Sequence, residues 1–375
     1  MSERAGFPHH MLKEIHEQPR GVRETVVPRL TSAHERVVFP GLGIEESEFR
    51  ALRRIQIVGS GTSRHAGLAG KYMIEQLARL PVEVDHASEF AYRDPIVGGN
   101  ELVVAITQSG ETVDTLNALR EASARGGRTI GICNVIDSTI AREADGALYT
   151  YAGPEISIAS TKAFTAQLAV LYLLALYLGE HCGNLSGEAL RQRIAALLDV
   201  PAAIDSALQT AGQCRQLAEE YCGVRDFLYL GRGVHYPVAL DGALKLKEVS
   251  YIHAEGHPAG EMKHGPNALI DEDLPVVILA TRDDASAGSR TRYEKTLSNL
   301  KEVKARSGQV IAVAVEGDDE IAESADHVIF VPPAPELLLP MLEIVPLQLL
   351  AYYVAVRRGL DVDKPRNLAK AVLVE

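Results

Sequence analysis

The chain has 375 residues, and its 50 aspartate and glutamate residues outnumber its 38 lysine and arginine residues, which gives a formal net charge of −12. This acidic balance argues against a general nucleic-acid binder and against binding to anionic membranes by charge. The four cysteines are far apart and form no CxxC pair, so neither a disulfide framework nor a zinc site is predicted. Residues 1–20 hold no signal-like segment, and no stretch approaches the apolar length of a membrane span, so we expect a cytoplasmic protein without a membrane partner.

The predicted elements alternate in chain order between strands and helices. Residues 1–50 are predicted to be helical or loop. Three short runs rich in valine, isoleucine and leucine follow, and each ends in a turn before a helical segment; they lie at 55–61, 101–110 and 129–135. A helical linking segment comes next, and the same alternation then returns, with apolar runs at 227–233, 274–283 and 310–315.

The two halves of the chain are related by an internal repeat. IAREADGALYTYAGPE at 140–155 matches IAESADHVIFVPPAPE at 321–336, at an offset of 181 residues. Continuous apolar strands that alternate with helices are typical of parallel sheets buried on both faces, so the sequence predicts an α/β protein with two tandem parallel sheets, each flanked by helices. The expected parts are an N-terminal helical segment, a first α/β domain, linking helices, a second α/β domain and a C-terminal tail, at 1–50, 51–185, 186–222, 223–360 and 361–375.

Hydroxyl groups gather in three turns of the first half, GSGTS at 59–63, TQSGET at 107–112 and SIAST at 157–161. Open α/β sheets bind ligands at such turns, and hydroxyls together with backbone N–H groups at a helix start can hold a phosphate. For any single residue, simple helix capping is the alternative. The matching turns of the second half have lost most hydroxyls, so we predict one phosphate site, in the first half. Its first two turns contribute Gly61, Thr62, Ser63, Thr107, Gln108, Ser109 and Thr112.

A charged segment, ALKLKEVSYIHAEGHPAGEMKHGP at 243–266, raises the question of acid and base chemistry. Lys245 and Glu248 are three residues apart on a predicted helix from Pro237 to Ile252, so they share a face. Glu248 could move protons, but spacing alone favours an ordinary surface ion pair. His264 lies in a segment rich in glycine and proline that is predicted to be an ordered loop, where it could be an acid or base or a structural histidine.

Several long motifs resemble the isomerase half of the glucosamine-6-phosphate synthase family (glutamine–fructose-6-phosphate aminotransferase, isomerising). They are GSGTS, TQSGET, ASTKAFTAQL, LGRGVHYPVALDGALKLKEVSYIHAE, AGEMKHGP, VPLQLLAYYVA and the tail DVDKPRNLAKAVLVE. The resemblance begins at MLKEIHEQP, residues 11–19, and covers nearly the whole chain. It implies two sugar-isomerase (SIS) domains of flavodoxin-like type, in agreement with the repeat.

The resemblance also implies a role for each matching residue. Ser63, Thr107, Gln108, Ser109 and Thr112 match the phosphate-binding turns, and Ile158 and Ser160 match residues that line the sugar. Glu248 matches the base that moves a proton between C1 and C2, beside Lys245, which handles the sugar oxygens. His264 matches the histidine that opens the sugar ring from the neighbouring subunit of a homodimer. Lys370 matches the lysine that forms a Schiff base with the open-chain ketose, and the tail closes over the site.

The implied reaction converts fructose 6-phosphate and ammonia into glucosamine 6-phosphate, without a metal or a cofactor. The family's glutaminase nucleophile, a cysteine at the mature N-terminus, has no counterpart here, since residue 1 is Met, residue 2 is Ser and no cysteine precedes Cys133. We therefore expect no glutamine hydrolysis by that route. Two interpretations stay open: an isomerase domain excised from such an enzyme, or a stand-alone protein that takes ammonia from solution or from a separate glutaminase. Two alternatives are an amino-sugar-phosphate deaminase, which runs the reaction in reverse, and a sugar-phosphate sensor without turnover.

Overall fold

The computed structural model describes residues 4–40, 42–44 and 46–370. These residues form two compact units. Unit 1 consists of residues 4–19, 156–161 and 200–368, and unit 2 consists of the described residues of 20–155 with 162–199 and 369–370. Of the predicted C-terminal tail, residues 371–375 lie outside the described residues.

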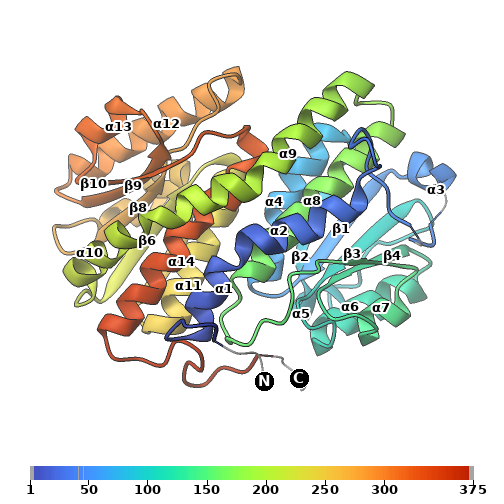
Figure 1. Ribbon diagram of the computed structural model, residues 1–375, viewed down its shortest axis with the longest axis horizontal. Helices are drawn as coiled ribbons and strands as arrows, with labels where there is room; N and C mark the ends of the chain where they lie inside the picture. The colour runs from blue at the N-terminus through green and yellow to red at the C-terminus, as the bar shows by residue number, and fades with distance from the viewer. Residues whose placement is uncertain (1–3, 41, 45, 371–375) are drawn as a thin grey trace. The chain divides into compact units, whose positions relative to one another are not determined.

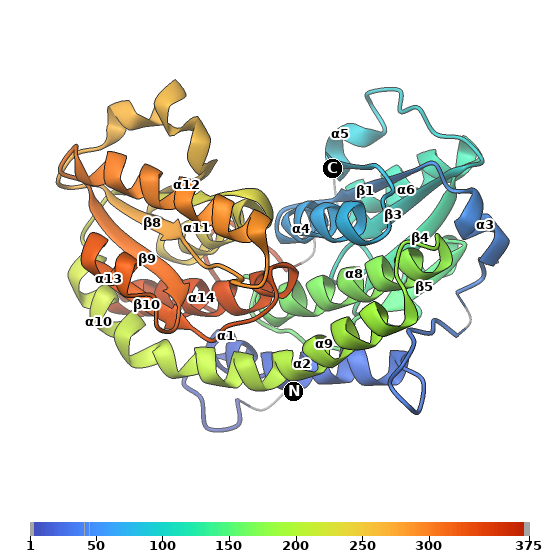
Figure 2. The ribbon, with the colours of Figure 1, turned by 90° about the horizontal axis from the view of Figure 1, so that it is seen from above.

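Unit 2 is built on a parallel sheet whose strand order is β2-β1-β3-β4-β5. The strands are β1 (Arg54–Gly59), β2 (Val82–His86), β3 (Glu101–Ile106), β4 (Arg128–Cys133) and β5 (Gly146–Tyr149). One face is covered by α4 (Thr62–Leu77), which packs side by side with α8 (Lys162–His181). On the other face (Figures 1 and 2) lie α5 (Ala87–Phe90), α6 (Val113–Ala124) and α7 (Thr139–Glu143).

Unit 1 holds a second parallel sheet with the order β10-β9-β8-β6-β7. Its strands are β6 (Asp226–Gly231), β7 (His253–Pro258), β8 (Pro275–Leu279), β9 (Gln309–Val315) and β10 (His327–Val331). One face packs against α12 (Ala287–Lys304) and α13 (Asp319–Ser324). The opposite side (Figure 1) carries α10 (Ala211–Tyr221), α11 (Tyr236–Ser250) and α14 (Pro340–Arg357).

Further helices complete the two units. The first 50 residues contribute α1 (His10–His16), α2 (Gln18–Val26), a 3₁₀ turn at Val27–Arg29 and α3 (Glu46–Ala51). The linking segment contains α9 (Gly187–Ala207) and the 3₁₀ turn Leu208–Thr210 before α10. In unit 1, 3₁₀ turns occupy Gly233–His235, Ala259–His264, Pro266–Leu269 and Glu336–Leu338.

The prediction of two helix-flanked parallel sheets is confirmed, and both sheets have the same flavodoxin-like order. The reason is visible in the central strands. In β1 and β3 all residues but the first are buried, and all five residues of β8 are buried. A strand buried on both faces needs apolar side chains at every position, and for this reason these runs were detectable in the sequence.

The prediction that residues 256–266 form a loop is wrong. β7 pairs in parallel with β6 from His253 to Pro258, and Ala259–His264 is a 3₁₀ helix. β7 is an edge strand, so only one of its sides makes backbone hydrogen bonds to a neighbour. It contains no valine, isoleucine or leucine and only one of its residues is fully buried, so it lacks the apolar run by which the central strands were predicted.

The expectation that no segment has the apolar length of a membrane span is also wrong. Among the described residues, three helical segments are long and apolar enough by length and composition: Lys162–His181, Gly187–Tyr221 and Glu336–Arg357. The apolar windows of the first and third are 89% and 94% buried inside the structure, and that of the second is 39% buried. In the first and third, apolar side chains on every face therefore reflect their place in a protein core.

Candidate active site

The first two hydroxyl-rich turns lie next to each other in unit 2. β1 and β3 are neighbouring strands, and their last residues, Gly59 and Ile106, are paired. The turns that follow these residues therefore meet at the carboxyl edge of the sheet, between the two strands at which the strand order reverses. Open α/β sheets bind their ligands at this place.

Two helices begin at this edge. α4 starts at Thr62 and α6 starts at Val113, and in the described part of the chain no side chain caps either start. The hydroxyls bond to one another or to neighbouring side chains: Thr107 Oγ1 and Thr112 Oγ1 are 2.9 Å apart, and Gln167 Nε2 donates to Ser63 Oγ at 3.0 Å. Helix starts that lack a side-chain cap can offer their backbone N–H groups to an anion.

Glycines let the backbone make these two turns. Gly61 has φ of +51°, which favours a residue without a side chain. Gly110 has φ of +72°, and a Cβ there would lie 2.0 Å from Ser138 Oγ. Gln108 and Ser109 lie in the same turn, where the Ser109 hydroxyl accepts from the backbone N–H of Glu111 at 3.2 Å.

A cavity of about 810 Å³ in unit 2 is bordered by Gln108. Its lining is mostly apolar and includes Val135, Ile136 and Tyr151. Glu155, which follows β5, also borders this cavity. The cavity therefore lies between Gln108 of the second hydroxyl-rich turn and Glu155.

Lys370 is held in unit 2 by a residue that the sequence analysis missed. Its Nζ donates to Glu155 Oε2 at 2.6 Å, and the Glu155 side chain has no exposed area. The other oxygen, Oε1, accepts from the backbone N–H of Ala163 in the first turn of α8 at 3.1 Å. One signal for Glu155 was available, since it is the last residue of the repeat and matches Glu336 at the offset of 181.

Ile158 and Ser160 lie in unit 1, on the segment 156–161. The Glu14 carboxylate accepts from the backbone N–H groups of Ile156 and Ser157, and Ile158 N donates to the carbonyl of Asp363 at 3.0 Å. The Asp363 carboxylate in turn accepts from the first two residues of α1, His10 N at 3.0 Å and Met11 N at 2.9 Å. Two segments far apart in sequence therefore fix the backbone around Ile158.

Lys245 and Glu248 form an ion pair in unit 1. They lie near the C-terminal end of α11, with Lys245 Nζ 2.5 Å from Glu248 Oε2. The Lys245 side chain is 1% exposed and that of Glu248 is 22% exposed. The pair is therefore not an ordinary surface ion pair, because its cation is buried and its carboxylate is only partly open to solvent.

His264 lies on the surface of unit 1. It is the last residue of the 3₁₀ helix Ala259–His264, and it is exposed, as is the adjacent Lys263. Met262, within the same helix, is buried in the core beside α12. This anchor fixes the helix, while the His264 imidazole faces outward.

The second sheet holds a buried ion cluster at the place that corresponds to the phosphate turns. His235 follows β6, and its Nδ1 is 2.7 Å from Glu343 Oε1, while Arg292 Nε donates to Glu336 Oε1 at 2.7 Å. Thr281, after β8, donates to Glu343.

These contacts shift the pKa values of the cluster. Burial alone would lower the pKa of His235, but the charges of Glu343 and Glu336 and their hydrogen bonds raise it to about 9. Burial alone would raise the pKa of Glu336, but its bonds to His235 and Arg292 and their charges lower it to about 2.

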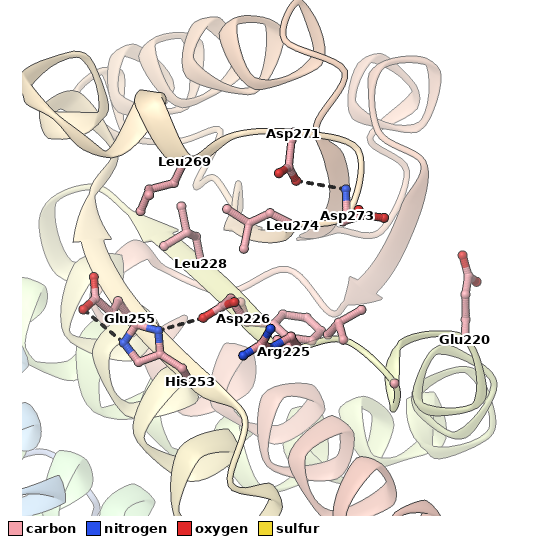
Figure 3. Close-up of a pocket in the computed structure, with 13 residues that line it drawn as sticks. Glu220, Arg225, Asp226, Leu228, His253, Glu255, Leu269, Asp271, Asp273 and Leu274 are labelled. Carbon is pink, nitrogen blue, oxygen red and sulfur yellow. Dashed lines mark hydrogen bonds and ion pairs between the residues drawn. The ribbon is translucent and has the colours of Figure 1, made fainter.

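Unit 1 also has a hollow of about 630 Å³ at the amino ends of β6 and β7 (Figure 3). In it the His253 ring lies between Asp226 and Glu255, with Nδ1 2.9 Å from Asp226 Oδ1 and Nε2 3.3 Å from Glu255 Oε1. The residues that line this hollow include none of those singled out in the sequence.

The residues singled out in the sequence are thus divided between the two units. Unit 2 gathers the two phosphate turns and Lys370, and unit 1 gathers the Lys245–Glu248 pair, His264 and the segment with Ile158 and Ser160.

A family model described as the SIS domain matches residues 48–177 and 224–358. Glutamine--fructose-6-phosphate aminotransferase (isomerizing) from Chlorobaculum tepidum is 51% identical over 373 residues, which cover 100% of this chain and 59% of the relative. The protein of the same name from Thermus thermophilus is 52% identical, with 100% of this chain and 60% of the relative covered. The chain therefore spans about 60% of the length of the curated relatives that it matches.

A solved structure, the C-terminal domain of glucosamine-fructose-6-phosphate aminotransferase from Francisella tularensis, is similar over nearly the whole chain. The TM-score is 0.90 at 38% sequence identity, with 97% of this chain and 100% of that chain covered. Both sheets fall within the residues that the family model matches. The chain belongs to the SIS-domain family, with two copies of the domain, and it is similar to the C-terminal domain of these aminotransferases.

Proposed function

We propose that the chain converts fructose 6-phosphate and ammonia into glucosamine 6-phosphate, as the names of its relatives suggest. The observation that carries the proposal is the Lys245–Glu248 pair, with a buried ammonium beside a carboxylate that solvent can partly reach. Such a carboxylate can take a proton from carbon while the neighbouring cation stabilises negative charge on the adjacent sugar oxygens.

The other residues have distinct roles in this proposal. The phosphate is bound at the starts of α4 and α6, by backbone N–H groups and by the hydroxyls of Ser63 and Thr112. Ile158 and Ser160 contact the sugar. Lys370 forms a Schiff base with the C2 carbonyl of the open-chain ketose and releases water. Ammonia then adds to this C2 iminium and displaces the lysine amine, which leaves the C2 imine. Glu248 removes the C1 proton and returns it at C2, which leaves an amino-aldose.

His264 opens the cyclic sugar in the site of a neighbouring subunit, so the working form is a homodimer. Its exposure on a fixed 3₁₀ helix supports this role, because an outward-facing imidazole can reach a second copy. The nitrogen comes from ammonia, either free or released by a glutaminase, and the protein works in the cytoplasm without a metal or a cofactor.

The test incubates the purified chain with fructose 6-phosphate, with and without ammonium, and with glucosamine 6-phosphate alone, and identifies the products by NMR. We expect glucosamine 6-phosphate only when ammonium is present, and we expect the Glu248→Gln variant to lose it. Rapid release of ammonia from glucosamine 6-phosphate would make the chain a deaminase instead. Binding without turnover in every mixture would leave a sugar-phosphate sensor.

A further inference from the structure

Glu155 holds the ammonium of Lys370 in a defined geometry. One carboxylate oxygen accepts from Lys370 Nζ at 2.6 Å, and the other accepts from Ala163 N at 3.1 Å. The Glu155 side chain is fully buried, whereas 25% of the Lys370 side chain is exposed. The lysine thus approaches the carboxylate from the open side, and the start of α8 fixes the carboxylate from the inner side.

This pairing creates a chemical requirement. A lysine attacks a carbonyl only as the neutral amine, because the ammonium has no lone pair. Lys370 must therefore pass a proton to an acceptor before it can react, and the Glu155 carboxylate lies 2.6 Å from its Nζ. The hydrogen-bonded neighbour is itself such an acceptor, since it lies within the distance at which a proton can be transferred directly.

We propose that Glu155 aims Lys370 and carries its proton, as base and then as acid, during Schiff-base formation with the ketose. The inference rests on the proposed function, of which it specifies one step. The Glu155 carboxylate takes a proton from the Lys370 ammonium. The lone pair of the amine then forms a bond to C2, and the C2=O π electrons move to the oxygen. The nitrogen is now positively charged and carries two protons. One of these protons moves to the oxygen, which gives a neutral carbinolamine.

Glu155 then returns its proton to the carbinolamine hydroxyl. The C–O bond breaks, water leaves, and the nitrogen lone pair forms the C=N bond of a protonated Schiff base. Glu155 is again a carboxylate and lies beside a cationic iminium in place of the ammonium. The Glu155–Lys370 pair has zero net charge both before and after the step, so the step leaves no new uncompensated charge within the pair.

The internal repeat supplies an independent observation. Glu336 occupies the position in the second half that Glu155 occupies in the first, and it also holds a cation, Arg292, with Nε 2.7 Å from Oε1. An arginine side chain stays protonated in proteins and is no nucleophile. The repeat position therefore pairs with a cation in both halves, Lys370 in the first half and Arg292 together with His235 in the second.

The experiment traps the Schiff base by reduction with borohydride in the presence of fructose 6-phosphate, and mass spectrometry locates the adduct. The wild-type chain is expected to carry a reduced sugar-phosphate adduct on Lys370. Glu155→Gln keeps the size of the side chain but can no longer take the proton, and we expect adduct formation and kcat to fall on the order of 10²-fold or more. KM for fructose 6-phosphate should stay within about 3-fold, because the residue contacts Lys370 and not the phosphate.

Two variants separate this role from a structural one. Glu155→Asp keeps a carboxylate and should recover part of the adduct rate that Glu155→Gln loses, which also covers the case in which the glutamine variant does not fold. Glu143→Gln, an exposed partner of Arg120 in unit 2, is the control and should trap like the wild type. The inference would be overturned if Glu155→Gln formed the adduct at the wild-type rate, or if an active wild-type enzyme formed no adduct on Lys370. Either result would leave the proposed function standing. Failure of the wild type to make glucosamine 6-phosphate would instead overturn the proposed function.

Discussion

Ser63 and His235 occupy equivalent positions in the two halves of the chain. Each is the fourth residue after the glycine that ends the first strand of its sheet, Gly59 of β1 and Gly231 of β6. Ser63 accepts a hydrogen bond from Gln167, while His235 pairs with Glu343. A neutral hydroxyl at this position leaves the helix start available to an anion. In the second half, the carboxylates of Glu343 and Glu336 lie at the corresponding place and would repel an anion. This contrast supports a single phosphate site.

The His235 cluster predicts a specific pH dependence of stability. The pKa of His235 is raised in the folded chain to about 9 from an ordinary value of 6.5. A raised pKa means that the folded chain binds the proton more tightly, so this contribution is complete below about pH 6.5 and is lost as the pH rises through about 9. The shift corresponds to about 3 kcal/mol in the free energy of unfolding.

Urea unfolding at intervals from pH 6 to pH 10 measures this loss. His235→Gln should be less stable than the wild type at pH 6 by about 3 kcal/mol, because it leaves the buried Glu343 without its cation. The difference should shrink as the pH rises to 10. His253→Gln, with a ring that is 62% exposed, is the matched control and should not change the slope. A constant difference between His235→Gln and the wild type at every pH would contradict the prediction.

The sequence analysis found the central strands of both sheets and missed the strands at the edges. β1, β3 and β4 in unit 2, and β6, β8 and β9 in unit 1, are apolar on both faces and were predicted. The strands that it missed are β2, β5, β7 and β10, the two edge strands of each sheet. An edge strand pairs on one side only and carries more exposed side chains, so it lacks the continuous apolar run that identifies a central strand.

The contacts of the site residues were predictable only where the two partners are close in sequence. The spacing of Lys245 and Glu248 placed them on one helix face, but it could not reveal that Lys245 is buried, because burial depends on how α11 packs against α14. The partner of Lys370 is 215 residues away in the chain. No periodicity links two such positions, since their contact arises from tertiary folding alone.

The hydroxyl of Thr112 is predicted to bind the substrate phosphate. Thr112→Val removes this hydroxyl at constant shape and should raise KM for fructose 6-phosphate about 10- to 150-fold, which corresponds to about 1.5–3 kcal/mol for one hydrogen bond to a charged group. We expect kcat to change little, because the phosphate is remote from the reacting carbons. Steady-state kinetics, with inorganic phosphate as a competitive inhibitor, measures both effects.

Thr115→Val provides the control for this substitution on the same helix. Thr115 is fully buried, and its hydroxyl has no hydrogen-bond partner among the described residues. Replacing it removes an unsatisfied polar group, so KM should be unchanged and stability unchanged or higher. Equal KM values for Thr112→Val and the wild type would remove Thr112 from the phosphate site.

Lys245 and Lys247 lie two residues apart on α11 and differ in burial. Lys245→Met should lower turnover by about 10²-fold, because it removes the cation that stabilises charge beside Glu248. Lys247 is exposed, and Lys247→Met should keep wild-type turnover.

Glu248→Gln should lower turnover by about 10²–10⁴-fold and abolish the incorporation of deuterium from D₂O at C1 and C2, which NMR detects. Deuterium incorporation at the wild-type rate in Glu248→Gln would assign the base to another residue.

Mixing two inactive variants tests whether His264 serves a neighbouring subunit. His264→Asn and Glu248→Gln should each be nearly inactive alone. In a hybrid dimer, one site combines the intact Glu248 of the first variant with the intact His264 of the second, and the other site has neither. Random exchange makes half of the dimers hybrid, so denaturation and joint refolding should restore about a quarter of wild-type activity. If each subunit used its own His264, every site in every dimer would lack one of the two residues, and the mixture would stay as inactive as its components.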